Sequence, residues 1–269
     1  MICCVLFVLG CSGDRDLEGT VTKNEDIKEP EVIITDTKKP EPEDNGPDIE
    51  VINEADGDPA DNTETDDPAE YQAEEPDPDK EFYITEITDE LFDRIYGKSF
   101  KEDCTLSRDD LRYLHLLHKD INDETHEGEM IVNASIADDV LEIFKELYEN
   151  DYPIEKIRLV DEYDADDEAS MEDNNSSCFN FRFVPRTTKI SKHGLGMAID
   201  INPLYNPYIT TVNGKQNVDP VNAGPYVDRD ADFDYKINKG DLCYNLFMEH
   251  GFTWGGEWKN SKDYQHFEK

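Results

Sequence analysis

The feature that most constrains this chain is a change of composition near residue 82. Residues 14–80 consist mainly of Asp, Glu, Pro, Asn and Thr, and their first aromatic residue is Tyr71. Such a segment cannot bury enough apolar surface to offset its loss of backbone entropy, so we expect residues 11–80 to be a disordered acidic linker. From Phe82 to the C-terminus aromatic and aliphatic residues recur. Residues 81–269 are therefore predicted to form one domain with a single core.

The charge balance limits the partners. The chain has 26 Lys and Arg against 65 Asp and Glu, a formal net charge of -39. Binding to phosphates requires clustered Lys and Arg, so we expect no nucleic acid partner. A dedicated ion-binding or protein-binding tail remains the alternative to a solvated spacer for the acidic run.

The first residues differ from the acidic segment. Residues 2–10 (ICCVLFVLG) form an apolar run, too short for a bilayer span of about 20 residues and suited to the h-region of a signal peptide. Gly10 before Cys11 resembles the bacterial lipobox, which implies cleavage before Cys11 and lipid attachment to its thiol. We expect residues 1–10 to be a lipoprotein-type signal peptide, with the protein anchored to the membrane and facing the periplasm or cell exterior. Because no Lys or Arg precedes the run, an uncleaved hydrophobic tail is the alternative.

Three cysteines remain beyond the leader: Cys104, Cys178 and Cys243. At most one disulfide can form among them, and their spacing matches no Cys-x-x-Cys metal pattern. We expect Cys178 to be a small buried thiol rather than a reactive one.

Local patterns predict three helices. The first covers residues 107–117, with an N-cap at Ser107 and apolar residues at helical spacing. The second covers residues 135–147 and carries a longer apolar stripe. The third covers residues 241–249 and ends before Gly251. His115 and His118 fall on or beside the first helix and are expected to pack or face solvent rather than bind metal.

Four short segments have the pattern of strands: residues 157–160, 179–183, 198–201 and 264–267. Alternation in the second segment places Asn180 and Arg182 on the face opposite the phenylalanines. The order of elements predicts an α+β fold, with a small antiparallel sheet flanked by helices.

The segment that carries the chemistry is residues 191–200 (SKHGLGMAID). Its glycines permit a tight turn after His193. The strand that follows directs Asp200 away from the face that buries its neighbours Ile199 and Ile201. The chain then ends with a second imidazole and a second carboxylate, in the segment 263–266 (DYQH).

Two imidazoles and one carboxylate are a familiar hydrolytic zinc shell, which leaves a fourth position for water. Zinc lowers the pKa of that water to about 7. A nearby carboxylate must still take the proton and pass it to the leaving amine. Asp263, three residues before His266, is the natural candidate.

At these residues the chain resembles the D-alanyl-D-alanine carboxypeptidase family of zinc peptidases. The motif Ser-x-His-x-x-Gly-x-Ala-x-Asp, here Ser191 to Asp200, is similar to the metal-binding signature of that family. An acidic residue three positions before the last His ligand is its second element. The family also includes D-Ala-D-Ala dipeptidases and phage L-alanyl-D-glutamate endolysins. The similarity extends from about Phe82 to the C-terminus and implies a hedgehog/DD-peptidase-like fold.

By position, the resemblance implies a Zn²⁺ site with three ligands: His193, Asp200 and His266. Asp263 would be the general acid/base. Arg182 would stabilise the oxyanion or hold a substrate carboxylate, tasks that suit guanidinium geometry. Arg186 is a weaker rival for that role, and Ser191 would support the site through hydrogen bonding.

The expected function is therefore hydrolysis of peptidoglycan stem-peptide bonds by a monomeric zinc peptidase of the D,D-carboxypeptidase type. An L-alanyl-D-glutamate endopeptidase on the same scaffold is one alternative. A non-catalytic, zinc-braced cell-wall binding module is another, although such a module has no use for the carboxylate of Asp263. The pair His126-Glu127 lacks the rest of a zincin motif, and residues 164–167 are expected to be a solvated acidic turn rather than a calcium loop.

Overall fold

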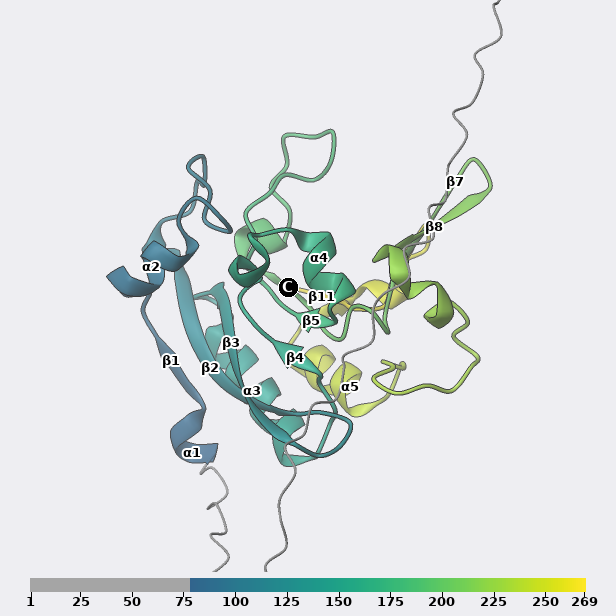
Figure 1. Cartoon of the computed structure of the whole chain (residues 1–269), viewed down its shortest axis with the longest axis horizontal. Helices are drawn as coiled ribbons and strands as arrows, with labels where there is room; N and C mark the ends of the chain where they lie inside the picture. The colour runs from purple at the N-terminus through teal and green to yellow at the C-terminus, as the bar shows by residue number, and fades with distance from the viewer. Residues whose placement is uncertain (1–77) are drawn as a thin grey trace, which may run out of the picture. The chain divides into compact units, whose positions relative to one another are not determined.

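A three-stranded antiparallel meander opens the part of the chain that the computed structural model describes, residues 78–269 (Figure 1). Strand β1 (Tyr83–Thr85) pairs with the central β2 (Leu111–Lys119), which pairs along its whole length with β3 (Thr125–Asn133). The predicted signal peptide, Cys11 and all but the last three residues of the predicted linker lie outside the described residues.

The helix expected over residues 107–117 is wrong. Ser107 forms a capping box with Asp110, but the helix that it caps is a single 3-10 turn, η1 (Arg108–Asp110), and Leu111 already belongs to β2. Strand β2 is mostly buried along its length, and an apolar run of this kind does not distinguish a buried strand from a helix. Pairing with two neighbouring strands makes residues 111–117 a strand, although the local pattern favours a helix.

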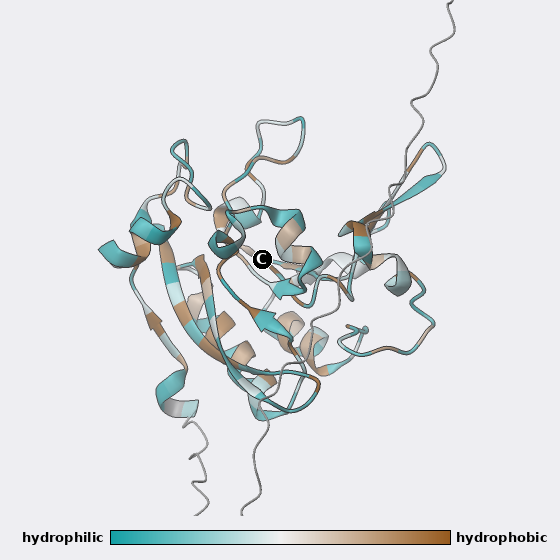
Figure 2. Cartoon of the chain, viewed as in Figure 1, coloured by the Kyte–Doolittle hydropathy of each residue, from teal (hydrophilic) through white to brown (hydrophobic). Residues whose placement is uncertain are grey.

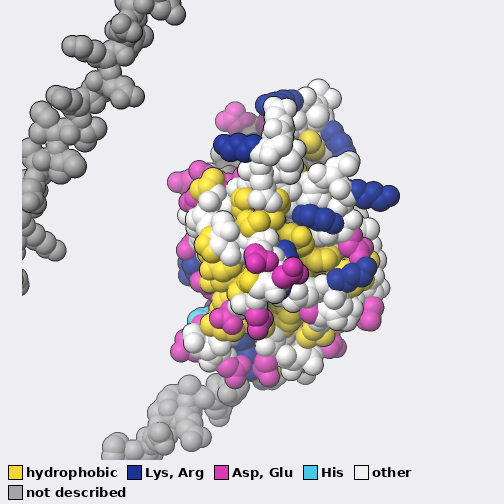
Figure 3. All heavy atoms as spheres, turned by 90° about the vertical axis from the view of Figure 1, so that its right-hand side faces the viewer, with side chains coloured by type: hydrophobic (Ala, Val, Ile, Leu, Met, Phe, Trp, Pro, Cys, Tyr) yellow, Lys and Arg dark blue, Asp and Glu magenta, His cyan; other side chains and the backbone are white. Residues whose placement is uncertain are grey.

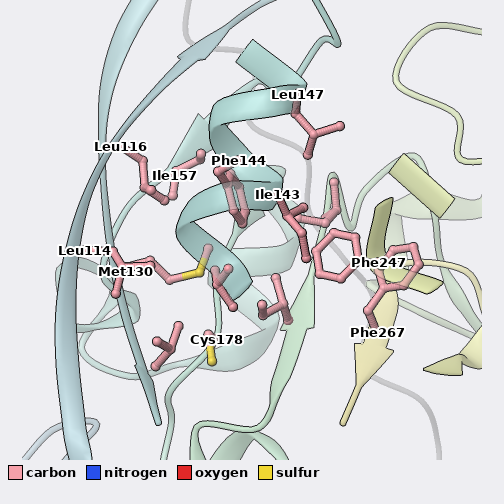
Figure 4. Close-up of a cluster of buried hydrophobic side chains, with 14 of the residues drawn as sticks. Leu114, Leu116, Met130, Ile143, Phe144, Leu147, Ile157, Cys178, Phe247 and Phe267 are labelled. Atoms are coloured by element: carbon pink, nitrogen blue, oxygen red, sulfur yellow. The ribbon is translucent and has the colours of Figure 1, made fainter. Parts of the chain in front are cut away.

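The core lies between the meander and the C-terminal part of the chain. Helix α3 (Ala137–Glu149) confirms the second predicted helix, although Ser135 does not cap it. The hydrophobic side of α3 faces the sheet (Figure 2). Phe144 packs near Leu116 of the meander on one side, while Phe247 and Phe267 approach from the other (Figure 4). The rings of Phe247 and Phe267 stack with centroids 4.2 Å apart, and one cluster of buried side chains contains residues of both parts.

Two further antiparallel sheets position the site. In one, β6 (Ala198–Asp200) pairs with β11 (His266–Glu268), which also pairs with β9 (Thr253–Trp254). In the other, β7 (Tyr208–Val212) pairs with both β8 (Lys215–Asp219) and β10 (Lys262–Asp263). The strand expected over residues 264–267 is thus displaced, because the chain leaves one sheet after Asp263 and enters the other at His266.

The other strand predictions are confirmed in part. Strand β4 (Lys156–Ile157) is shorter than expected and pairs in parallel with β5 (Asn175–Ser176). The segment 179–183 is no strand, and its one bridge joins Phe183 to Ile190. Ile199 and Ile201 enter the core as predicted.

The remaining helices are short. They are α1 (Pro78–Glu81), α2 (Asp89–Ile95), α4 (Asp167–Glu172) and α5 (Leu242–Glu249), with 3-10 turns η2 (Val160–Tyr163), η3 (His193–Leu195), η4 (Val221–Tyr226) and η5 (Gly255–Glu257). Helix α5 confirms the third prediction, with Asp241 as N-cap and Gly251 at φ 81° beyond its end. The small antiparallel sheets and few helices agree with an α+β fold. Within residues 78–269 no helix has the length and apolar character to cross a membrane.

Candidate metal centre and active site

His193 lies on the 3-10 turn η3, which two neighbours shape. The Ser191 hydroxyl accepts a hydrogen bond from the backbone N–H of Gly194 at 2.9 Å, a supporting contact of the kind expected of Ser191. Gly196 ends the turn at φ +67°, and a Cβ there would meet the backbone nitrogen of Asn133 at 2.7 Å. Only glycine fits this left-handed position and close approach. The motif therefore fixes where His193 stands against the end of β3.

Hydrogen bonds fix the orientation of the His193 ring. Its Nδ1 lies 2.8 Å from the carbonyl oxygen of Cys178. A carbonyl can only accept, so Nδ1 carries the hydrogen and the lone pair is on Nε2. Nε2 faces Asp200 Oδ2 at 3.1 Å. The imidazole is 6 % exposed and thus presents a basic nitrogen inside the protein.

The antiparallel pairing of β6 and β11 brings the other two predicted ligands together. Asp200 and His266 are direct partners in the register, and His266 Nδ1 lies 3.0 Å from Asp200 Oδ1. On the opposite edge of the ring, Nε2 lies 3.4 Å from Glu268 Oε2. That carboxylate accepts the Nε2 hydrogen, so the lone pair of neutral His266 is on Nδ1, toward Asp200.

The three side chains fit a metal ion. His193 Nε2 and His266 Nδ1 lie 3.2 Å apart, and two lone pairs at this distance repel unless a cation or proton lies between them. With bonds of about 2.0–2.1 Å, ligand atoms of a tetrahedral zinc shell lie roughly 3.3–3.4 Å apart, close to the separations found here. Oriented imidazoles with fixed outer hydrogen bonds are typical of such shells. His193, Asp200 and His266 could therefore hold a metal.

The electrostatics of this group also favour a cation. Burial opposes a charge on His266, yet hydrogen bonds with Asp200 and Glu268 raise its pKa to about 10. Burial likewise opposes a charge on Asp200, but its close contacts with His193 and His266 hold the pKa of this carboxyl well below its usual range. The buried carboxylate thus attracts positive charge to the point between the two rings, where a proton and a metal compete.

Asp263 ends β10 beside this group. Gly255 packs so closely on it that a Cβ would meet the Asp263 carbonyl oxygen at 2.6 Å. Burial, partly offset by His266 and reinforced by the charge of Asp200, raises the pKa of the Asp263 carboxyl to about 7. A carboxyl that titrates near neutrality is suited to accept and donate protons.

Arg182 approaches from the extended segment before the motif. Its Nη2 lies 2.9 Å from Oδ2 of Asp167 at the start of α4, while Nη1 is buried with no hydrogen-bond partner among residues 78–269. The acidic turn expected over residues 164–167 is therefore more than a solvated one. Arg186, the weaker rival, stands in the exposed loop after Phe183 and does not line the site.

One cleft of about 590 Å³ is bordered by the three candidate metal ligands and by Ser191, Asp263 and Arg182. Its lining consists of Asp166, Asp167, Glu168, Met171, Arg182, Phe183, Val184, Pro185, Ser191, His193, Asp200, Tyr208, Asp219, Asp263, Gln265 and His266. Figure 3 shows the face that bears the β7–β8 hairpin, where Lys and Arg side chains are spread over the upper part and acidic ones gather lower down. Sequence reasoning missed Asp167 and Gln265, although Gln265 directly precedes a predicted ligand.

A cleft with a His–Asp–His group, a near-neutral carboxyl and an arginine has the residues of a hydrolytic metal site. Residues 185–269 match a family model described as D-alanyl-D-alanine carboxypeptidase. The matched part contains His193, Asp200, Asp263 and His266, whereas Arg182 lies before its first residue. No curated protein and no solved structure matches the chain. The match covers less than half of the chain and supports peptidase activity for this cleft.

Proposed function

We propose that the protein is a zinc-dependent peptidase that hydrolyses stem-peptide bonds of peptidoglycan, of the D,D-carboxypeptidase type. The observation that carries the proposal is the position of the buried Asp263 carboxyl in the same cleft as the His–Asp–His group, where burial also raises its pKa. A metal that only braces a fold needs no such group. The match to a D-alanyl-D-alanine carboxypeptidase model supports the substrate class.

The residues divide the chemistry among them. Zinc, when bound by His193, Asp200 and His266, supplies a Lewis acid that makes water acidic enough to react near pH 7. Asp263 takes the proton of the attacking water and returns it to the leaving amine. The free Nη1 of Arg182 donates to the oxygen that becomes negative at the attacked carbonyl.

An L-alanyl-D-glutamate endopeptidase is the second candidate, and one contact favours it. Asp167 occupies Nη2 of Arg182 at 2.9 Å. A terminal carboxylate is bound best by both edges of a guanidinium, and here one edge is already paired. An internal peptide bond requires only one donor for its carbonyl oxygen.

We also propose where the protein is located and which fold its catalytic domain has. We place the protein in the cell envelope, monomeric, with a hedgehog/DD-peptidase-like catalytic domain tethered by lipid at Cys11 through the acidic segment. Incorporation of labelled palmitate that is lost in Cys11→Ala is the expected result. Unlabelled native protein, or Cys11→Ala that stays in the membrane fraction, would contradict the lipid anchor.

The function is tested with zinc-loaded full-length protein and the peptide L-Ala-γ-D-Glu-L-Lys-D-Ala-D-Ala. Mass spectrometry of the products distinguishes release of the terminal D-Ala from release of L-Ala. We expect the first product, and the second would replace the carboxypeptidase by the endopeptidase. Bound zinc with neither product would indicate a zinc-braced binding module instead.

A further inference from the structure

Unsatisfied polar atoms concentrate in the cleft. Within residues 78–269, four buried side-chain atoms have no hydrogen-bond partner, and three of them belong to residues that line the cleft: Arg182 Nη1, Asp263 Oδ1 and Gln265 Oε1. Leaving a buried polar group unpaired costs about 1–3 kcal/mol. Three such groups on one cleft are therefore candidates for hydrogen bonds to a bound ligand.

Gln265 is the member of this set without a role in the chemistry described above. Its side chain is almost fully buried, at 2 % exposure. Its backbone oxygen accepts from the N–H of Ile201 at 3.0 Å, which ties it to the chain just beyond β6. A structural amide at such a depth normally has both ends paired.

The orientation of the Gln265 amide follows from its neighbour. The NH₂ end is assigned to the side of the Asp263 carboxylate, because the Gln265 side chain acts to lower the pKa of that carboxyl. The reverse orientation would set two oxygens against each other, so the carboxylate fixes which atom is free. Gln265 lines the cleft, and its Oε1 is a buried acceptor with no partner among residues 78–269.

The unpaired atoms have complementary characters. Arg182 offers a donor, while Asp263 and Gln265 offer acceptors. A peptide backbone supplies the matching groups, a carbonyl oxygen for Arg182 and N–H groups for the two acceptors. Asp263 is assigned to the proton that moves to the leaving amine, which leaves Oε1 of Gln265 for a second N–H.

We propose that Gln265 is a substrate-binding residue whose Oε1 accepts a hydrogen bond from a backbone N–H next to the scissile bond. This rests on the proposed peptidase function and defines its substrates as chains with at least two successive secondary amides at the site. A substrate that lacks the N–H leaves the Gln265 oxygen unpaired, and a site built for a hydrogen bond discriminates strongly against such analogues.

The variant Gln265→Met keeps the length of the side chain and removes both polar ends. Because a buried, unpaired oxygen disappears, we expect the Tm of the substrate-free protein to stay equal or rise. We expect kcat/KM for the stem pentapeptide to fall about 10-fold to 100-fold, mainly through KM. Gln265→Asn, which retains an amide but withdraws it, should show an intermediate loss. The matched control is Gln216→Met on the exposed strand β8, where no change is expected.

The deciding experiment is an ester scan of the pentapeptide, in which each amide N–H is replaced singly by oxygen. With native zinc-loaded protein, one replacement beside the cleaved bond should lower kcat/KM about 10-fold. In Gln265→Met the same replacement should change kcat/KM less than about 3-fold, whereas Gln216→Met should behave as native.

Two outcomes would overturn the role of Gln265. One is that the ester replacement lowers kcat/KM equally in native protein and in Gln265→Met. The other is that no replacement affects native protein, while the Gln265 variants lose zinc. Absence of any cleavage by native protein would overturn the proposed function, and this inference with it. If native protein cleaves the peptide but the effect of the ester replacement does not depend on Gln265, the peptidase function stands and only the role of Gln265 is overturned.

Discussion

Two pairs of histidines in this protein share a geometry and differ in chemistry. The rings of His193 and His266 have centroids 5.0 Å apart, and those of His118 and His126 on the β2–β3 hairpin 5.3 Å apart. Each pair has one ring fixed through Nδ1 to a backbone carbonyl, Cys178 for His193 and Ile154 for His118. Ring spacing and backbone anchoring therefore do not by themselves bring both rings of a pair into one group of possible metal ligands, as happens for His193 and His266.

The two pairs of histidines differ in how the neighbouring carboxylate contacts them. Asp200 is buried and contacts both rings of the first pair. In the second pair Asp120 touches only the half-exposed His126, at 3.3 Å, and its carboxylate also accepts from the N–H groups of Asn122 and Glu124. Burial lowers the pKa of His118 to about 4, so it packs as a neutral ring. His266, next to Asp200, has its pKa raised to about 10.

The largest effect that separates the pairs is expected from alanine substitutions. His266→Ala should lose bound zinc and reduce hydrolysis more than about 10⁴-fold, because both shell and reaction depend on it. His118→Ala should keep zinc and kcat and lose only stability, about 1–3 kcal/mol. Zinc content and initial rates of hydrolysis are measured for both variants. Stoichiometric zinc in His266→Ala would show that the ligand set is wrong.

Asp263→Asn tests the carboxyl beside the first pair. Loss of the acid/base group should lower kcat about 10²-fold to 10⁴-fold with zinc content unchanged. Asp230→Asn, in an exposed loop, is the control. A variant with native kcat would remove Asp263 from the mechanism.

The pH dependence of zinc binding follows from the raised pKa of His266. Below about pH 10 the metal-free ring holds a proton, which zinc must displace, so affinity should rise roughly tenfold per pH unit between pH 7 and 9. Titration against a competing chelator at three pH values measures the slope. A flat profile would mean that His266 is already neutral in the metal-free protein.

Glu268→Gln weakens the outer partner of His266. Outer hydrogen bonds of metal-bound histidines contribute about 10-fold to 100-fold to affinity, and we expect a loss in this range. Glu257→Gln, which breaks an exposed contact with Lys239, should leave zinc affinity unchanged. Equal affinities of the two variants would show that Glu268 does not orient the ring.

The smallest effect concerns stability, and its sign differs between the pairs. The folded pKa of His118, about 4, lies below that of free imidazole, so the unfolded chain binds a proton first and stability falls by about 1–3 kcal/mol as pH drops from 6.5 to 4. The raised pKa of His266 stabilises the metal-free protein below pH 6.5, and this contribution is lost as pH rises through 10. Thermal unfolding of chelator-treated protein tests both. His118→Asn should remove only the fall in Tm between pH 6.5 and 4. An unchanged fall in this variant would show that His118 does not cause it.

The sequence identified the group of possible metal ligands, which lie together in the structure, better than it predicted the elements around them. His193 and Asp200 stand in one segment whose glycine and strand pattern place them locally, and the structure brings His266 to them. Their meeting depends on the β6–β11 pairing of segments 66 residues apart, which local patterns do not encode. Asp167 and Gln265 were missed for the same reason, since their significance lies in contacts with Arg182 and in an unpaired atom.

The N-terminal meander was predicted least well. Leucines 111, 114 and 117 have helical spacing, yet they belong to β2 because β1 and β3 pair with it from distant positions. In the structure the turn between β2 and β3 is stabilised by Asp120, which accepts hydrogen bonds from two backbone N–H groups, and Asp123 stands in it at φ 65°.

Zinc binding by His193, Asp200 and His266 is tested by a crystal structure of the zinc-loaded full-length protein with anomalous data at the zinc edge. If these three residues bind zinc, a peak is expected about 2.0–2.2 Å from His193 Nε2, His266 Nδ1 and an Asp200 oxygen, with the fourth position free of protein atoms. A peak at Asp120 and His126 instead, a fourth protein ligand that closes the shell, or no peak would contradict it.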